Sequence, residues 1–149
     1  LEKIQTPKVD STTDANGLQA IKVTFDGGIL FPPTGSTLTT QARTDLSEFA
    51  LSLQQNPETN VQVFGYTDNT GTLAANQKVS DARANSVRQY LIECGVSGAR
   101  ITAQGRPLCD YVASNETAAG RAQNRRVEIY ISANEQMIKQ AEAEAAQQR

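Results

Sequence analysis

The chain has 149 residues, of which 14 are basic, 16 are acidic and none is histidine, so its formal net charge at pH 7 is −2. This length suits one compact domain with short extensions, and a hydrophobic fraction of 38% suggests that the extensions are polar. The lack of histidine excludes Ser-His-Asp and Cys-His nucleophile systems and any His-ligated metal, and the sequence contains no run of about 20 apolar residues of the kind a transmembrane helix needs.

The N-terminal part predicts a linker followed by a strand. Residues 1–17 are polar and rich in turn formers, which is typical of a leader or linker. Apolar and polar residues alternate over 21–25, the period of a half-buried strand. The glycines at 27–28 break this strand, the apolar run 29–31 is predicted to be extended, and the prolines at 32–33 prevent further ladder bonding.

The middle of the chain predicts two helices around a strand. Apolar residues recur at helical spacing from 38 to 53, with Thr39 or Thr40 as the cap and Asn56-Pro57 as the stop. A strand over 61–64 follows and runs into a turn. A second helix is predicted from Leu73 to Glu93, ending at Gly95.

The remaining segments complete an α+β domain. They predict a strand over 100–104, a long irregular connection over 105–124, a strand over 127–131 and a final polar helix from 135 to 148. Strands that alternate with helices predict a two-layer sandwich with helices on one face of a single sheet. The chain is thus divided into a leader (1–17), one domain (18–133) and a polar C-terminal helix or tail (134–149).

Positive charge is concentrated in one part of this domain. Residues 78–126 hold eight basic and four acidic side chains, a net charge of +4, which leaves −6 for the rest of the chain. Clustered arginines favour recognition of carboxylate or phosphate, because the planar guanidinium forms two parallel hydrogen bonds. The alternative for any one of them is solvated surface charge. With a pI near 5.2 and 5% aromatic residues, we expect no nucleic-acid partner.

A carboxylate, an amide and a guanidinium are predicted to share one site. Asp68 directly follows a strand, at the edge where open sheets place ligands. Asn76 and Arg83 are seven residues apart and therefore share a helix face, with Leu73 three residues before Asn76. This array suits a zwitterion, with Asp68 pairing with an ammonium group and Arg83 with a carboxylate. Alternatively, Asp68 caps the helix and Arg83 forms an ordinary surface salt bridge.

A second arginine pair begins the last strand. Arg125 precedes the strand and Arg126 enters it, so alternation places their side chains on opposite sides of the chain. One of the two is predicted to join the site while the other pairs at the surface.

The two cysteines lack the spacing of a metal or redox motif. Cys94 and Cys109 are fifteen residues apart. They are either two small buried hydrophobes or one disulfide that joins a helix end to the loop after the next strand, as an oxidising compartment allows. We expect the disulfide.

Three motifs in the right order resemble the OmpA-like domain, the peptidoglycan-binding module of Gram-negative outer-membrane proteins, peptidoglycan-associated lipoproteins and flagellar stator proteins. They are FGYTDNTG at 64–71 with Asn76 after it, VSDARANSV at 79–87, and GRAQNRRVEI at 120–129. The resemblance extends over about residues 21–131. It implies a β-α-β-α-β-β sandwich with a mixed sheet, which binds the cell-wall stem peptide non-covalently.

The resemblance also implies which residues bind. Asp68 and Arg83 match the family's residues that grip diaminopimelate, and Asn76 and Arg125 match supporting positions, while two edge positions correspond to Thr70 and Leu73. It implies no catalytic residue, metal or cofactor. It places the domain at the periplasmic face of the outer membrane, attached to a membrane only through an anchor upstream of Leu1, as a monomer or a weak homodimer.

One departure and two other function classes accompany this assignment. Many family members have an aspartate where this chain has Pro32-Pro33, so one ligand contact is expected to be missing or replaced by backbone. A cell-wall glycosidase would need two carboxylates, for which Asp68 and Asp81 are the nearby pair. An oligomerisation module would act through the C-terminal helix, which has too few apolar residues for strong association.

Overall fold

The computed structural model describes residues 8–13, 19–32 and 35–133, and the predicted helix over 135–148 lies outside them. The strands are β1 (Lys8–Thr13), β2 (Gln19–Asp26), β3 (Thr59–Tyr66), β4 (Ile101–Arg106) and β5 (Arg126–Ala133). The helices are α1 (Gly27–Leu30), α2 (Thr40–Gln55), α3 (Leu73–Glu93) and α4 (Ala118–Asn124), with a 3₁₀ turn, η1 (Gly98–Arg100), before β4.

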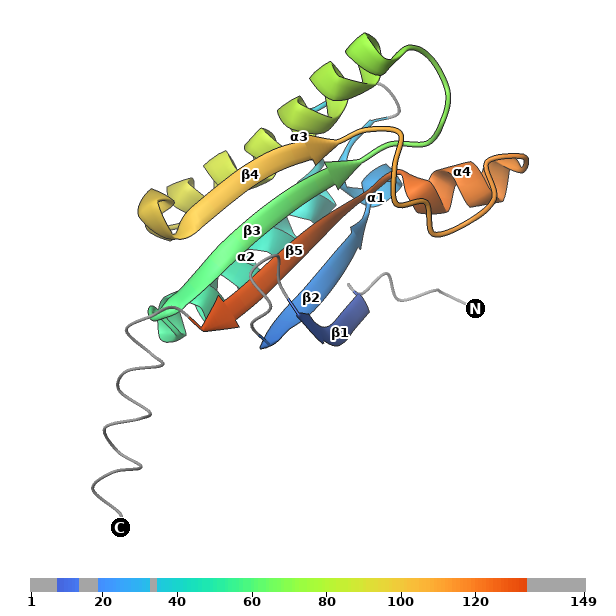
Figure 1. The fold of residues 1–149 in the computed structure, drawn as a ribbon. Helices are drawn as coiled ribbons and strands as arrows, with labels where there is room; N and C mark the ends of the chain where they lie inside the picture. The colour runs from blue at the N-terminus through green and yellow to red at the C-terminus, as the bar shows by residue number, and fades with distance from the viewer. Residues whose placement is uncertain (1–7, 14–18, 33–34, 134–149) are drawn as a thin grey trace, which may run out of the picture.

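The strands form one mixed sheet with α2 and α3 packed on the same face (Figure 1). The order is β1-β2-β5-β3-β4, with β3 and β4 parallel and the other neighbours antiparallel. The parallel pair arises because α3 returns the chain to the edge at which β3 began. This arrangement confirms the predicted α+β two-layer sandwich. No helix of the described ranges is long and apolar enough to cross a membrane.

The long helices begin and end at the signals that the sequence carries. The Thr39 hydroxyl accepts a hydrogen bond from the Ala42 N–H and begins α2, and Thr72 does the same for α3. Gly95 follows the end of α3 with a φ of +102°, a conformation that favours glycine. Each helix turns one apolar stripe toward the sheet, where it meets alternate residues of the strands. The stripes and the facing strand residues are Ala42, Leu46, Ala50 and Leu53 of α2, Ala84, Val87 and Leu91 of α3, and Val61, Val63, Val127 and Ile129 of the sheet.

Two glycines bring α3 unusually close to the sheet. Gly65 and Gly105 are register partners at the ends of β3 and β4. A Cβ atom on Gly65 would lie 2.5 Å from the Ser80 carbonyl oxygen, and one on Gly105 would lie 2.5 Å from the Asp81 nitrogen. The Gly105 N–H also donates to Asp81 Oδ1 over 2.8 Å. Any side chain at either glycine would push α3 away from the carboxyl edge of the sheet.

Three short elements were not predicted, and each has a local cause. β1 lies within the segment predicted as a leader or linker, which corrects that prediction for Lys8–Thr13, because antiparallel pairing with β2 stabilises it through its backbone. α1 replaces the predicted extended run at residues 29 and 30, while Phe31 is extended as predicted, because Asp26 caps the helix through a 2.7 Å bond from the Gly28 N–H. α4 interrupts the connection predicted to be irregular, because Thr117 caps it. The outer limits of the domain stay a prediction.

The expected disulfide is wrong for this structure, in which Cys94 and Cys109 are both free. Cys94 caps the C-terminal end of α3, which lies beside the start of β4, whereas Cys109 follows the end of β4 (Figure 1). Six strand residues span about 20 Å, and a disulfide requires Cα atoms within about 7 Å. The crossover geometry that makes β3 and β4 parallel therefore holds the two thiols at opposite ends of the sheet.

We expect Gly65→Ala to destabilise the domain by about 1–3 kcal/mol, the usual range for overpacking. The new methyl group would meet the Ser80 backbone, which moves only if α3 moves. Urea denaturation followed by circular dichroism measures the change. Gly35→Ala is the matched control, because its Cβ would have no neighbour nearer than 3.5 Å, and equal unfolding of the two variants would contradict the close-approach constraint.

Candidate ligand-binding site

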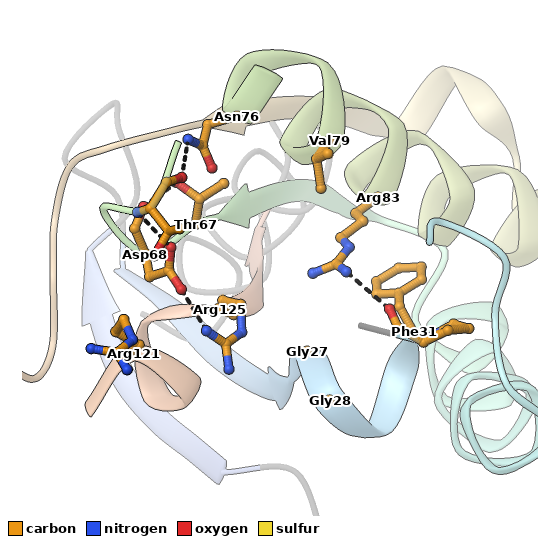
Figure 2. Close-up of a pocket in the computed structure, with 12 residues that line it drawn as sticks. Gly27, Gly28, Phe31, Thr67, Asp68, Asn76, Val79, Arg83, Arg121 and Arg125 are labelled. Atoms are coloured by element: carbon orange, nitrogen blue, oxygen red, sulfur yellow. Dashed lines mark hydrogen bonds and ion pairs between the residues drawn. The ribbon is translucent and has the colours of Figure 1, made fainter. Parts of the chain in front are cut away.

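A pocket of about 490 Å³ opens at the carboxyl edge of the sheet, between α1, α3, α4 and the turn after β3 (Figure 2). Its wall combines charged, polar and apolar groups. The lining residues are Gly27, Gly28, Phe31, Pro32, Thr67, Asp68, Thr70, Asn76, Val79, Arg83, Arg121 and Arg125. Among the predicted site residues, the structure brings together five, namely Asp68, Thr70, Asn76, Arg83 and Arg125.

Asp68 is a nearly buried carboxylate that is held on both oxygens. Its Oδ1 accepts a hydrogen bond from the Thr70 N–H over 2.8 Å, and its Oδ2 pairs with Arg125 Nη1 at 2.5 Å. Burial by itself would raise the pKa of Asp68, but the Thr70 hydrogen bond and the Arg125 guanidinium outweigh it and leave the pKa below its ordinary value of 3.8. The pocket therefore presents a fixed negative charge at neutral pH.

Asn76 shapes the turn beside this carboxylate. Its Nδ2 donates to the carbonyl oxygens of Thr70 and Thr72 over 2.7 and 2.8 Å. These bonds tie the turn to the first turn of α3 and so position the Thr70 N–H that binds Asp68. The amide nitrogen thus acts on the site through the backbone. Leu73 is 60% exposed and does not line the pocket, so a role for it stays a prediction.

Arg83 is buried on the same face of α3 as Asn76 and Val79 (Figure 2). Its Nε and Nη2 donate to the carbonyl oxygens of Gly35 and Pro32 over 2.9 and 3.1 Å, and its guanidinium lies 5.0 Å from the centre of the Phe31 ring. Burial, with a smaller effect of the Arg125 charge, lowers the pKa of Arg83. Pro32, which stands where many members of the family have an aspartate, thus contacts Arg83 through its backbone carbonyl.

Arg125 reaches the pocket from the C-terminal end of α4. Its carbonyl oxygen accepts a 2.9 Å hydrogen bond from the Gly27 N–H, which joins α1 to this point. A Cβ on Gly27 would lie 2.4 Å from that oxygen, so only glycine allows the contact. The backbone contact with α1, a segment distant in sequence, thus helps to fix Arg125 where its side chain meets Asp68.

Arg126 points to the opposite face of the sheet, as strand alternation predicts. Its Nε pairs with Glu128 Oε2 over 2.8 Å, and both side chains are only 5% exposed. Its guanidinium stacks 3.9 Å from the centre of the Tyr66 ring. Burial, with the Glu128 charge as the next cause, raises the pKa of Tyr66 to about 12. In the described structure Arg125 lines the pocket, whereas the predicted surface pairing of the other arginine is wrong, because Arg126 pairs with Glu128 in a buried ion pair.

Sequence reasoning missed the parts of the wall that α1 and α4 provide. The sequence predicts neither α1, the helix that Phe31 directly follows, nor α4, the helix that carries Arg121. The signals were Asp26 before Gly27-Gly28, and Thr117 three residues before Gly120, each typical of a helix cap.

The described lining residues contain one carboxylate and three guanidiniums. Asp81, the second carboxylate considered for a glycosidase, does not line the pocket: it accepts bonds from the Gly105 N–H and from Gln77 Nε2. The described residues contain no group of three or more acidic or cysteine side chains suited to a metal ion. The arrangement suits a ligand that offers an ammonium group and a carboxylate on an aliphatic chain, with Phe31 and Val79 facing that chain.

These features define a two-layer α+β domain with a charged ligand pocket at the edge of its sheet. Residues 30–125 match the OmpA family, and the chain belongs to that family. It is 41% identical over 112 residues to the probable lipoprotein YiaD of Escherichia coli, covering 75% of this chain and 51% of that protein. It is 39% identical over 113 residues to the peptidoglycan-binding protein ArfA of Mycobacterium bovis, covering 76% of this chain and 35% of that protein.

A solved structure shares the fold along most of both chains. It is described as the cell wall anchor of the type VI secretion system (T6SS) from Pseudomonas aeruginosa, with a TM-score of 0.76, 34% identity, and coverage of 87% of this chain and 90% of that one. By contrast, the chain spans about half or less of the two curated relatives described above.

Asp68→Asn should lower the stability at pH 7 by about 1 kcal/mol, because it leaves Arg125 without its partner while that side chain is still 40% exposed to screening water. A carboxyl group with a lowered folded-state pKa stabilises the fold above its unfolded-state pKa and loses this effect as pH falls through the folded-state value. The difference between the two proteins should therefore be constant from pH 7 to about 5 and narrow below 3.8.

Urea denaturation at a series of pH values measures this difference. Asp45→Asn is the control, because Asp45 lies on α2, does not line the pocket and accepts a hydrogen bond from the neutral Gln41 Nε2. A difference that widens as the pH falls would contradict the assigned charge state of Asp68.

Proposed function

We propose that this domain binds the peptidoglycan stem peptide non-covalently, through the free end of its diaminopimelate residue, and so anchors an envelope protein to the cell wall. The observation that carries the proposal is a pocket lined by an ionised Asp68 and a buried Arg83, together with the apolar side chains of Phe31 and Val79. The end of the diaminopimelate side chain carries an ammonium group and a carboxylate on one carbon, which matches these two charges. ArfA, a relative named for binding peptidoglycan, and the T6SS cell wall anchor with the same fold support it.

Each side chain has a defined part in the proposed complex. Asp68 accepts from the ammonium group, and the guanidinium of Arg83 donates to the carboxylate. Arg125 and the Thr70 N–H hold Asp68 in place, and Asn76 fixes the turn. Because these groups are already positioned, little ordering is needed when the ligand binds.

The proposed setting is the periplasmic face of the outer membrane. The similarity to the lipoprotein YiaD supports an envelope location. In this proposal the domain works as a monomer or a weak homodimer, and a segment outside this chain supplies the membrane anchor. The pocket's role is recognition without turnover, since its described wall offers Asp68 as its only carboxylate.

We expect a soluble diaminopimelate-type stem peptide to bind, and the corresponding lysine-type peptide to bind at least tenfold more weakly. Lysine lacks the second carboxylate, and a hydrogen bond to a charged group contributes about 1.5–3 kcal/mol. Asp68→Ala and Arg83→Ala should each weaken binding of the diaminopimelate peptide by a similar factor. Isothermal titration calorimetry measures all of these affinities.

Arg43→Ala is the matched control for charge, because Arg43 is exposed on α2 and does not line the pocket. Since Arg83 is buried, thermal unfolding of each variant must show that it is folded at the titration temperature, and Arg83→Lys provides a milder change. Equal affinity for both peptides, or variants that bind as the wild type does, would refute the proposal. Release of soluble muropeptides from peptidoglycan by the purified protein would show an enzyme instead.

A further inference from the structure

Arg121 places a third guanidinium on the wall of the pocket. It belongs to α4, four residues before Arg125, and in Figure 2 Arg125 lies between it and Arg83. The contacts assigned above to the diaminopimelate end involve Asp68 and Arg83 and give Arg121 no part. The pocket therefore contains one guanidinium, that of Arg121, to which the proposed binding of diaminopimelate assigns no ligand group.

The loop that precedes α4 holds this arginine in place. Arg121 Nη1 donates to the Asn115 carbonyl oxygen over 2.8 Å. Asn115 Oδ1 accepts from Asn124 Nδ2 over 2.9 Å, and the fully buried Asn124 also accepts from two backbone N–H groups of the same loop. A Cβ on Gly120 would lie 1.8 Å from the Ser114 carbonyl oxygen, so α4 packs directly against this loop. The packing of α4 against the loop thus fixes the backbone near Arg121, and the Asn115 carbonyl fixes one nitrogen of its guanidinium.

The charges of the pocket do not balance without a further anion. Its described wall carries Arg83, Arg121 and Arg125 against Asp68 alone, a net charge of +2. Of the two ion pairs among the described residues, Arg125–Asp68 and Arg126–Glu128, neither includes Arg121. The end of a diaminopimelate side chain is a zwitterion and leaves this excess unchanged. Like charges that share a partly desolvated pocket raise each other's free energy, which an anionic ligand group relieves.

We propose that Arg121 forms a second subsite, which binds a carboxylate of the stem peptide outside the diaminopimelate side chain. This inference rests on the function proposed above. A guanidinium with one nitrogen used by the Asn115 carbonyl still offers donors for a carboxylate in its plane. Two groups of the peptide have this chemistry, the α-carboxylate of the γ-linked glutamate before diaminopimelate and the carboxylate at the peptide C-terminus.

The experiment compares peptides that differ only in amidation. Calorimetry is done with a diaminopimelate peptide that has both carboxylates free, with its glutamate α-amide and with its C-terminal amide. For the wild type, one of the two amides should bind about 3–10-fold more weakly than the free acid, and this identifies the source of the carboxylate. Arg121→Gln should weaken binding of the free acid by the same factor and no longer distinguish it from that amide. Arg121→Lys, which keeps the charge but not the planar donors, should bind the free acid more weakly than the wild type and more tightly than Arg121→Gln.

Arg43→Gln is the control for the loss of one positive charge and should bind like the wild type. Binding by Arg121→Gln that still distinguishes the free acid from the amide, or a wild type indifferent to both amidations, would overturn the second subsite while leaving the diaminopimelate contact intact. A wild type that binds diaminopimelate and lysine peptides equally would instead overturn the proposed function, and the second subsite with it. Thermal unfolding of Arg121→Gln separates loss of binding from loss of fold.

Discussion

The close approach of α3 to the carboxyl edge of the sheet is the constraint on which the pocket depends. Gly65 and Gly105 lie side by side, and the backbone of α3 at Ser80 and Asp81 occupies the space that their side chains would need. This contact sets the depth at which the whole helix lies. Arg83 follows it by less than one turn of α3, while Asp68 follows Gly65 by three residues. The same contact therefore fixes the position of Arg83 on the helix relative to that of Asp68 after the strand.

The Asp68–Arg125 pair matters more for position than for stability. Arg125 is 40% exposed on its side chain, so water screens its attraction to the carboxylate and limits the contribution of the pair to the free energy of folding to about 1 kcal/mol. However, the pair joins the turn after β3 to the end of α4, and the Gly27 N–H bond to the Arg125 carbonyl adds α1 to the same point. Three separate segments of the pocket wall thus meet at one arginine.

The length of each helix or strand decided whether the sequence predicted it and the site residues that it carries. The helix from Leu73 to Glu93 is long enough for its period to show that Asn76 and Arg83 share a face, and strand ends place Asp68 beside them. α1 and α4 have four and seven residues, too few for an apolar period, so they are visible only through their capping residues. Arg121 and Phe31 were missed for that reason. The disulfide was wrong because the strand between the two cysteines, although predicted, holds them at opposite ends of the sheet, farther apart than a disulfide allows.

The consecutive arginines at the start of β5 show how the strand period connects the two faces of the sheet. Arg125 turns to the pocket, while Arg126 is buried on the opposite face against Glu128 and Tyr66. A buried ion pair is stable only when its remaining donors are satisfied, and Arg126 donates its other nitrogens to the carbonyl oxygens of Asn124 and Asp110. These carbonyls belong to α4 and to the loop that precedes it. The arginine that faces away from the pocket therefore helps to hold the helix and loop that carry the pocket's third guanidinium.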